Sequence, residues 1–230
     1  MTEFHQRRIE FEERSLADRG KNQWAKFTAD MQRYTGTQIK PWSLRFLKAL
    51  AHAAYEHPGL LAIVVYRYGQ WVLYCCRFPI WKQLHSLNYY YWFFWVRTRL
   101  QIELPRTTAI DAGFRIDHFG AILINCQLIA GKNLTITHGV LVGETDNGVP
   151  RMRDNVSIGV GAKIIGGLML EDHVMVGAGA VVTKSFPAYA NVAGVPAKLL
   201  RIREHSGNGH VPSLEIVSET PQAERQHEEN

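Results

Sequence analysis

The chain of 230 residues has few cysteines and no long apolar segment. Its three cysteines, Cys75, Cys76 and Cys126, are odd in number and lack the spacing of metal ligands, so we expect reduced thiols and no metal site. The longest apolar stretch, residues 60–74, contains Arg67 and is shorter than the ~20 residues that a helix needs to cross a bilayer. The charged N-terminal stretch lacks the apolar core of a signal peptide, which favours a cytoplasmic protein.

The charge of the chain is modest, with 26 basic and 21 acidic residues and a formal net charge of +5. The basic residues do not gather in one stripe, so we expect no nucleic-acid partner. A weak positive field suits a small polyanionic molecule instead. Peripheral contact with a membrane is one interpretation of the aromatic run YYYWFFW at residues 89–95, because such rings favour membrane–water interfaces. Packing between helices, or against another subunit, is the favoured interpretation.

A period of six residues runs from residue 136 to residue 186, and neither a helix nor a pleated strand produces it. Aliphatic residues or Met open each six: Ile136, Val142, Met152, Ile158, Ile164, Leu170, Val176 and Val182. Five of these have a small or aliphatic residue four places later: Val140, Val156, Ala162, Val174 and Ala180. Such a period predicts a coil of three six-residue sides, about eighteen residues per turn. The opening side chains then stack inside, where each contributes roughly 1.5–3 kcal/mol.

Glycines and insertions mark the corners of this coil. Gly143, Gly159 and Gly177 directly follow inward residues, so we expect them at corners with unusual backbone conformation. The register is interrupted before Ile124, and again by the DNGV segment at residues 146–149. Loops that leave a solenoid tend to lie on one face and often build its binding site.

Composition divides the chain into four segments. Residues 1–38 are charged and predict a solvated polar arm, and residues 39–101 predict a domain of three helices, broken at Pro58 and Pro79. Residues 102–204 hold the repeats and, from about Leu199, a short closing helix. Residues 205–230, rich in Ser, Pro, Glu and Gln, predict a disordered tail.

The segment from residue 102 to residue 201 resembles the serine acetyltransferase family of hexapeptide-repeat acyltransferases, which includes relatives in polysaccharide biosynthesis. The resemblance is carried by Ile116-Asp117-His118, the IGVGAK and VGAGAVV turns, AGVPAKLL at 193–200 and YRYGQW at 66–71. It implies a mainly β protein, a left-handed parallel β-helix preceded by a small α-helical domain. It also implies a homotrimer with active sites between subunits, and leaves a dimer of trimers open.

The resemblance assigns the general base of the reaction to His118, because this turn matches the family's catalytic aspartate–histidine stretch. Histidine suits the role since it exchanges protons near neutral pH. The carboxylate that orients the base falls on Glu103, fifteen positions earlier, and Asp117 matches an aspartate that faces the acceptor. Successive strand residues point to opposite faces, so Asp117 and His118 share a pocket only at a corner. His138 is a second candidate base.

By the same resemblance the acetyl donor is acetyl-CoA, and no metal is needed. The small residues along which its pantetheine arm runs in the family fall on Gly159, Ala162, Gly177 and Ala178. The cations near the closing turns that could meet its phosphates are Lys184, Lys198 and Arg201.

Departures from the family pattern concern the acceptor. An arginine–histidine pair that grips the amino acid falls on Gly148 and Val149, and an aspartate–proline pair reads His57-Pro58. Two anchors for an amino acid are thus missing. The sequence predicts an acetyl-CoA-dependent O-acetyltransferase acting on a sugar hydroxyl in exopolysaccharide biosynthesis. Two alternatives stay open: serine O-acetylation for cysteine biosynthesis, and a non-catalytic trimeric scaffold that binds partners through its aromatic helices.

Overall fold

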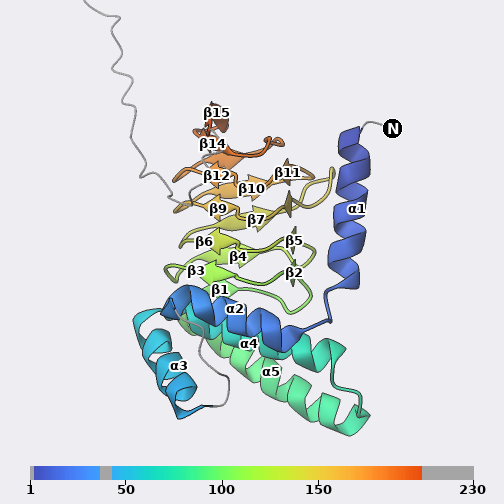
Figure 1. Ribbon diagram of the computed structural model, residues 1–230, viewed down its shortest axis with the longest axis vertical. Coiled ribbons are helices and arrows are strands. Elements are labelled where there is room, and N and C mark those ends of the chain that lie inside the picture. Colours follow the sequence, from blue (N-terminus) through green and yellow to red (C-terminus); the bar gives the residue numbers. More distant parts are fainter. Residues whose placement is uncertain (1–2, 37–42, 204–230) are drawn as a thin grey trace, which may run out of the picture.

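The computed structural model describes residues 3–36 and 43–203, which form a triangular β-helix standing on a layer of helices (Figure 1). The helices are α1 (Glu3–Ala17), α2 (Gln23–Thr35), α3 (Leu44–Glu56), α4 (Gly59–Tyr74) and α5 (Pro79–Arg99). Within the described residues, none of them combines the length and the apolar character needed to cross a membrane.

Three parallel sheets form the sides of the prism, which makes about five left-handed turns. Sheet A contains β1 (Ile102–Glu103), β4 (Ile122–Ile124), β7 (Leu141–Gly143), β10 (Lys163–Ile165) and β13 (Val181–Val182). Sheet B contains β2 (Ala109–Ile110), β5 (Ile129–Ala130), β8 (Arg151–Met152) and β11 (Met169–Leu170). Sheet C contains β3 (Arg115–Ile116), β6 (Thr135–Ile136), β9 (Ser157–Ile158), β12 (Met175–Val176), β14 (Ala190–Ala193) and β15 (Lys198–Ile202).

The period of six in the sequence is the period of the prism. All eight residues that open a six are at most 4% exposed, and the five small or aliphatic residues four places later are fully buried. They stack in register from coil to coil, as Ile136 does with Ile158 on sheet C. The predicted parallel β-helix is confirmed, and its core is a column of aliphatic side chains.

The corner glycines have a different role from the one predicted. Gly159 and Gly177 are absent from the glycines with positive φ, whereas Gly161 and Gly179, two residues later, have φ of 68° and 65°. A Cβ on Gly159 would lie 2.8 Å from the backbone nitrogen of Ala178 in the next coil. Gly159 is therefore required for close stacking of coils, and the unusual backbone belongs to the glycines that follow.

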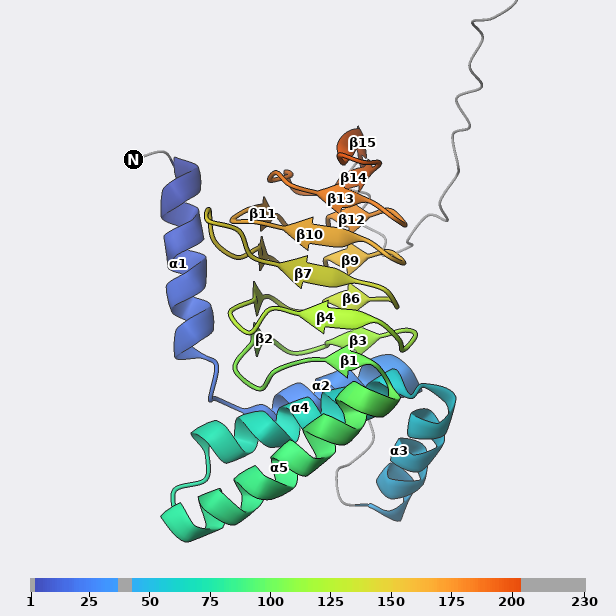
Figure 2. The same cartoon turned by 180° about the vertical axis from the view of Figure 1, so that it is seen from behind.

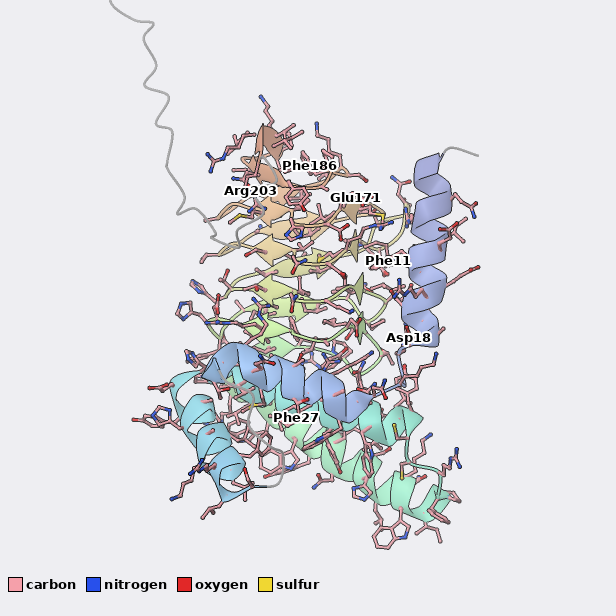
Figure 3. The ribbon with its side chains drawn as sticks, viewed as in Figure 1. Phe11, Asp18, Phe27, Glu171, Phe186 and Arg203 are labelled. Carbon is pink, nitrogen blue, oxygen red and sulfur yellow. The ribbon has the colours of Figure 1, made fainter. Side chains whose placement is uncertain are left out.

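The charged N-terminal segment is packed on the molecule and is not a solvated arm. Helix α1 runs along the side of the prism, and Phe11 points toward the β-helix (Figure 3). Glu12 of α1 forms an ion pair with Arg151 of β8, with 2.8 Å between Oε1 and Nε. Helix α2 buries Asp30 completely. The helical layer thus begins before residue 39. The sequence did not indicate this, because the faces of α1 and α2 that pack are short and most of their other residues are charged or polar.

A buried ion pair joins the helices to the first coil. Arg67 of α4 is 4% exposed and pairs with Asp30 of α2 at 2.7 Å. Its guanidinium also donates to the backbone oxygens of Ile110 and Asp111, at 2.9 and 2.6 Å. Next to it, the hydroxyl of Tyr66 donates to the oxygen of Thr108. The Tyr66-Arg67 dipeptide of the resemblance therefore fixes the β-helix on its base.

The top of the prism closes with a strand and not with the predicted short helix. Strand β15 runs antiparallel to β14 and pairs Lys198 with Ala193. Without it, β14 would be an open sheet edge, and a short antiparallel strand covers such an edge. The predicted disordered tail, residues 205–230, lies outside the described residues.

Candidate active site

Two histidines lie one above the other at the corner where sheet C leads into sheet A. His118 follows the end of β3 by two residues, and His138 follows the end of β6 by two residues. Ile116 and Ile136 are partners in register, so both side chains project at the same corner of successive coils. Their rings contact edge to face with centroids 5.8 Å apart. Both are exposed and open to a substrate.

The same corner continues upward through Val160 and Ala178, each again two residues beyond a strand of sheet C. Within the described chain, neither backbone N–H of these two residues donates a hydrogen bond. The neighbouring glycines, Gly161 and Gly179, would place a Cβ in open space. The corner above the histidines thus carries two unpaired backbone donors beside the exposed side chain of Val160.

Three of the four small residues predicted for the cofactor lie at this corner. Gly159 and Gly177 sit immediately before Val160 and Ala178, and Ala178 carries one of the two unpaired amides. Ala162 does not reach the surface, because its side chain is fully buried inside the prism. Val160 was missed in the sequence; its place in the period of six, two after the inward Ile158, is the signal that could have identified it.

Asp117 is held on the outer face of sheet C. Its carboxylate forms a short ion pair with Arg115, two residues earlier on the same face. Arg115 in turn donates from Nη1 to the backbone oxygen of Arg33 at 2.9 Å, and its guanidinium lies 5.5 Å from the ring centre of Tyr34. Asp117 therefore points toward α2, and the structure does not join it to His118 within one chain.

Glu103 lies on β1, directly below β4, the strand that begins four residues after His118. Its carboxylate pairs with Arg97 of α5, with 3.2 Å between Oε2 and Nε. No hydrogen bond joins Glu103 to His118 among residues 3–36 and 43–203. The Arg97–Glu103 pair is partly exposed, and such pairs contribute little, so the carboxylate can exchange partners at small cost.

The three predicted cations lie near the top of the prism but not at one corner. Lys198 and Arg201 are exposed on β15, the outermost strand of sheet C (Figure 2). Lys184 follows β13 at the corner between sheets A and B, where its ammonium lies 5.7 Å from the ring centre of Phe186. Lys198 and Arg201 are thus the two that share sheet C with the histidines.

The loop that interrupts the repeat between β7 and β8 is short and closed on itself. Thr145 and Gly148 exchange backbone hydrogen bonds of 3.1 and 2.8 Å. Val149 is 4% exposed. The two positions at which the family has its acceptor-binding pair therefore offer one bare backbone and one buried apolar side chain.

A separate cavity of ≈ 280 Å³ lies between α1 and sheet B. Its lining carries charges of both signs: Arg14, Arg19, Lys26, Lys132 and Arg153 with Asp18, Asp111, Asp154 and Asp172. Lys26 pairs with Asp111 at 3.4 Å, and burial lowers the pKa of Lys26. This cavity was not predicted from the sequence, because it forms only where α1 packs beside sheet B. None of the predicted site residues lines it.

Comparison with known proteins gives a consistent result, although no family model matches the chain. The chain is 30% identical over 148 residues to the serine acetyltransferase of Buchnera aphidicola subsp. Schizaphis graminum, which is 62% of this chain and 54% of that protein. It is 30% identical over 149 residues to that of Synechococcus elongatus, covering 63% and 57%. The chain thus spans about half the length of the curated relatives that it matches.

Solved structures agree with this match. The crystal structure of serine acetyltransferase from Brucella abortus strain S19 superposes with a TM-score of 0.63 at 26% identity, covering 82% of this chain and 73% of that one. The structure of a serine acetyltransferase from the same strain in complex with coenzyme A gives a TM-score of 0.61 at 27% identity, covering 78% and 68%.

A triangular β-helix of hexapeptide repeats, with two exposed histidines beneath a strip of bare backbone, defines a hexapeptide-repeat protein of the acyltransferase superfamily. Within that superfamily the chain is similar to the serine acetyltransferases, over about half the length of the curated relatives. The resemblance read from Ile116-Asp117-His118 and the small-residue turns is confirmed.

Proposed function

We propose that this protein transfers an acetyl group from acetyl-CoA to a hydroxyl acceptor. The observation that carries the proposal is the corner of the prism on which His118 lies exposed below the unpaired amides of Val160 and Ala178. A base and a row of free donors at one corner are what acyl transfer requires.

The corner fits the pantetheine arm of coenzyme A. Its backbone donors are unpaired, and Gly161 and Gly179 add no side chain that would stand between an extended arm and the backbone. Lys198 and Arg201 lie on the uppermost strand of sheet C, where cations can meet phosphates. These are the residues that we assign to binding the donor, with Gly159, Gly177 and Ala178 shaping the strip. Lys184 is assigned a lesser part because it lies at another corner.

The chemistry assigned to the chain is proton transfer. Acetyl-CoA supplies an acetyl thioester. An imidazole nitrogen of His118 accepts the hydroxyl proton as the acceptor oxygen bonds to the acetyl carbon, the carbon–sulfur bond breaks, and the thiolate leaves. Backbone N–H groups at the corner stabilise the negative charge that develops on the carbonyl oxygen. Glu103 orients His118 when it leaves Arg97, and His138 is the alternative base.

The acceptor is a sugar hydroxyl in this proposal, as in exopolysaccharide biosynthesis. Gly148 has no side chain and Val149 is buried, so neither position offers a cation to the carboxylate of an amino acid. A carboxylate left without a cation on binding would lose more hydration than it regains. The second candidate is L-serine, as in cysteine biosynthesis, and the names of the relatives favour it.

The assembly proposed is a homotrimer, in which a neighbouring prism covers the exposed corner. A single chain leaves His118 and His138 open on the surface. Acyl transfer needs the exclusion of water, which would otherwise compete with the acceptor. A second prism along this corner would enclose the strip and could bring Asp117 of one subunit toward the acceptor in the next.

The deciding experiment is thiol release from acetyl-CoA by the purified protein, with L-serine, simple sugars and nucleotide sugars compared at equal concentrations. Release with sugars but not with serine supports the proposed acceptor. Release with serine places the enzyme with the second candidate and shows that other groups replace the missing anchors. No release with any acceptor, together with no heat of coenzyme A binding, contradicts acetyl transfer and favours the scaffold.

A further inference from the structure

Helix α5 exposes apolar side chains on the face opposite its packed one. The packed face contains the buried Tyr89 and Val96 and lies against α4 and β1. On the opposite face, at helical spacing of three and four residues, five apolar side chains are between 54% and 75% exposed: Ile80, Leu84, Leu87, Tyr91 and Phe94. A helix at a protein surface normally has polar residues on this face, so the pattern calls for a covering partner.

Further aromatic residues widen this apolar stripe toward the turn between α4 and α5. Phe78 and Trp81 are 72% and 60% exposed. In both views the α4–α5 hairpin forms the lower part of the molecule, on the side opposite β15 (Figures 1 and 2). With its 21 residues, α5 is roughly 30 Å long. The stripe therefore occupies a long face at the end of the molecule distant from the cations of β15.

The charge near the stripe is mainly basic. No aspartate or glutamate occurs between Glu56 and Glu103. The exposed cations of this stretch stand at the two ends of α5, with Arg77 before its start and Arg97 and Arg99 in its last turn, where Arg97 pairs with Glu103. An apolar centre with Trp and Tyr and basic residues at its ends is the composition of a helix that lies in the interface of a bilayer.

A second α5 helix does not match that charge. If two α5 helices met face to face, in either direction, the cations at the ends of one would lie against those of the other with no carboxylate from this stretch between them. Anionic lipid headgroups supply the missing charge, while the acyl chains cover the apolar side chains. We propose that the α5 stripe is a peripheral docking surface for an anionic phospholipid membrane.

The test is flotation of the full-length protein with vesicles on a density gradient. Vesicles of phosphatidylglycerol and phosphatidylcholine in equal amounts should carry the protein upward, and vesicles of phosphatidylcholine alone should carry much less. High salt should reduce the floated fraction, because screening weakens the contribution of the cations. Wild-type protein that stays at the bottom with the anionic vesicles overturns the proposal.

Variants locate the contact. The double variant Leu87→Ser and Phe94→Ser should lose flotation, whereas the matched control Tyr55→Ser on α3, where the side chain is 87% exposed, should keep it. The charge reversal Arg77→Glu with Arg99→Glu should also lose flotation, while Lys48→Glu on α3 should keep it. Unchanged circular dichroism and thiol release would show that each variant is folded.

The competing occupant gives a different result. The molar mass of wild type and of the Leu87→Ser and Phe94→Ser variant is measured by light scattering at the same concentration, without vesicles. An equal mass, together with lost flotation, supports the membrane. If the variant has a smaller mass and wild type does not float, the stripe is a contact between copies and the proposal is wrong.

Discussion

Two corners of the same prism both require a left-handed backbone conformation, and different types of residue adopt it at each. Between sheets B and C the left-handed positions are filled by Asn133, Asn155, His173 and Tyr189, with φ between 58° and 62°. Between sheets C and A the corresponding positions are the glycines Gly139, Gly161 and Gly179. The left-handed positions carry side chains at the first corner and are glycines at the second.

The side chains of the corner between sheets B and C contact one another. The side-chain amide of Asn133 donates to Asn155 at 3.0 Å, Asn155 lies 3.4 Å from Nε2 of His173, and the ring of His173 stacks on that of Tyr189 with centroids 4.6 Å apart. This side-chain ladder leaves little for a ligand to bind. The glycine corner leaves amides unpaired, and His118 stands below them. Side chains thus contact one another at one corner of the repeat, and backbone donors stay unpaired at the other.

The largest expected effect is on turnover, and it should distinguish the histidine of one corner from that of the other. Replacing His118 with Ala should lower turnover roughly 10²–10⁴-fold, because the acceptor hydroxyl loses its base. Coenzyme A binding, measured by calorimetry, should stay unchanged. The matched control is His173→Ala in the ladder, which should turn over at the wild-type rate. Normal turnover of His118→Ala would reject it as the base, and a loss in His138→Ala alone would move the role there.

A second variant converts the bare corner into a copy of the ladder. Gly161→Asn with Gly179→Asn places side chains that tolerate a left-handed backbone, as Asn155 does, along the proposed path of the pantetheine arm. Coenzyme A binding should weaken roughly tenfold or more, about 1.4 kcal/mol for each factor of ten. Isothermal calorimetry measures the affinity, and thermal melting checks that the fold is intact. Unchanged affinity would show that the donor lies elsewhere.

The converse variant breaks the ladder. Asn155→Ala removes two side-chain contacts and leaves alanine in the left-handed region, which should lower the free energy of unfolding by about 1–2 kcal/mol. Turnover per folded molecule should not change. Urea denaturation measures the stability, with Asn155→Asp as a control that keeps the acceptor for Asn133 and a residue able to accept this backbone. A loss of turnover without a loss of stability would mean that the ladder corner also takes part in catalysis.

The smallest expected effect concerns α1, which covers the side of the prism near sheet B. Burial raises the pKa of Glu12, but hydrogen bonds from Arg151 and Arg8 outweigh it and hold the pKa below its usual value. A lowered pKa stabilises docking above the unfolded pKa, and that contribution is lost as the pH falls through the folded pKa. Amide hydrogen exchange of α1 should therefore rise in acid before that of the β-helix, and Glu12→Gln should show the rise at neutral pH. Simultaneous exchange of both would contradict this.

The prism was predictable from the sequence because a repeated inward aliphatic residue leaves a strict period. Met152 is the instructive case, since the period places it inside despite the insertion before it, and it is fully buried. His118 was singled out for a different reason, its match to a known turn; the structure places it exposed at a corner, and its role as the base stays a prediction. The docking of α1 and α2 was not, because single long-range pairs such as Arg67 with Asp30 leave no periodic trace. The antiparallel β15 was missed since a short apolar stretch fits a helix or a strand equally well.

The stacking of coils also fixes distances along the glycine corner. Neighbouring strands lie about 4.8 Å apart, and four such steps separate the coil of His118 from that of β14, roughly 19 Å in all. The number of coils, and not any one side chain, therefore sets the distance between His118 below and the cations of β15 above. Insertion or deletion of one coil would shift that distance by about 4.8 Å, while every coil kept its own packing. The length of this corner therefore changes only in steps of one whole coil.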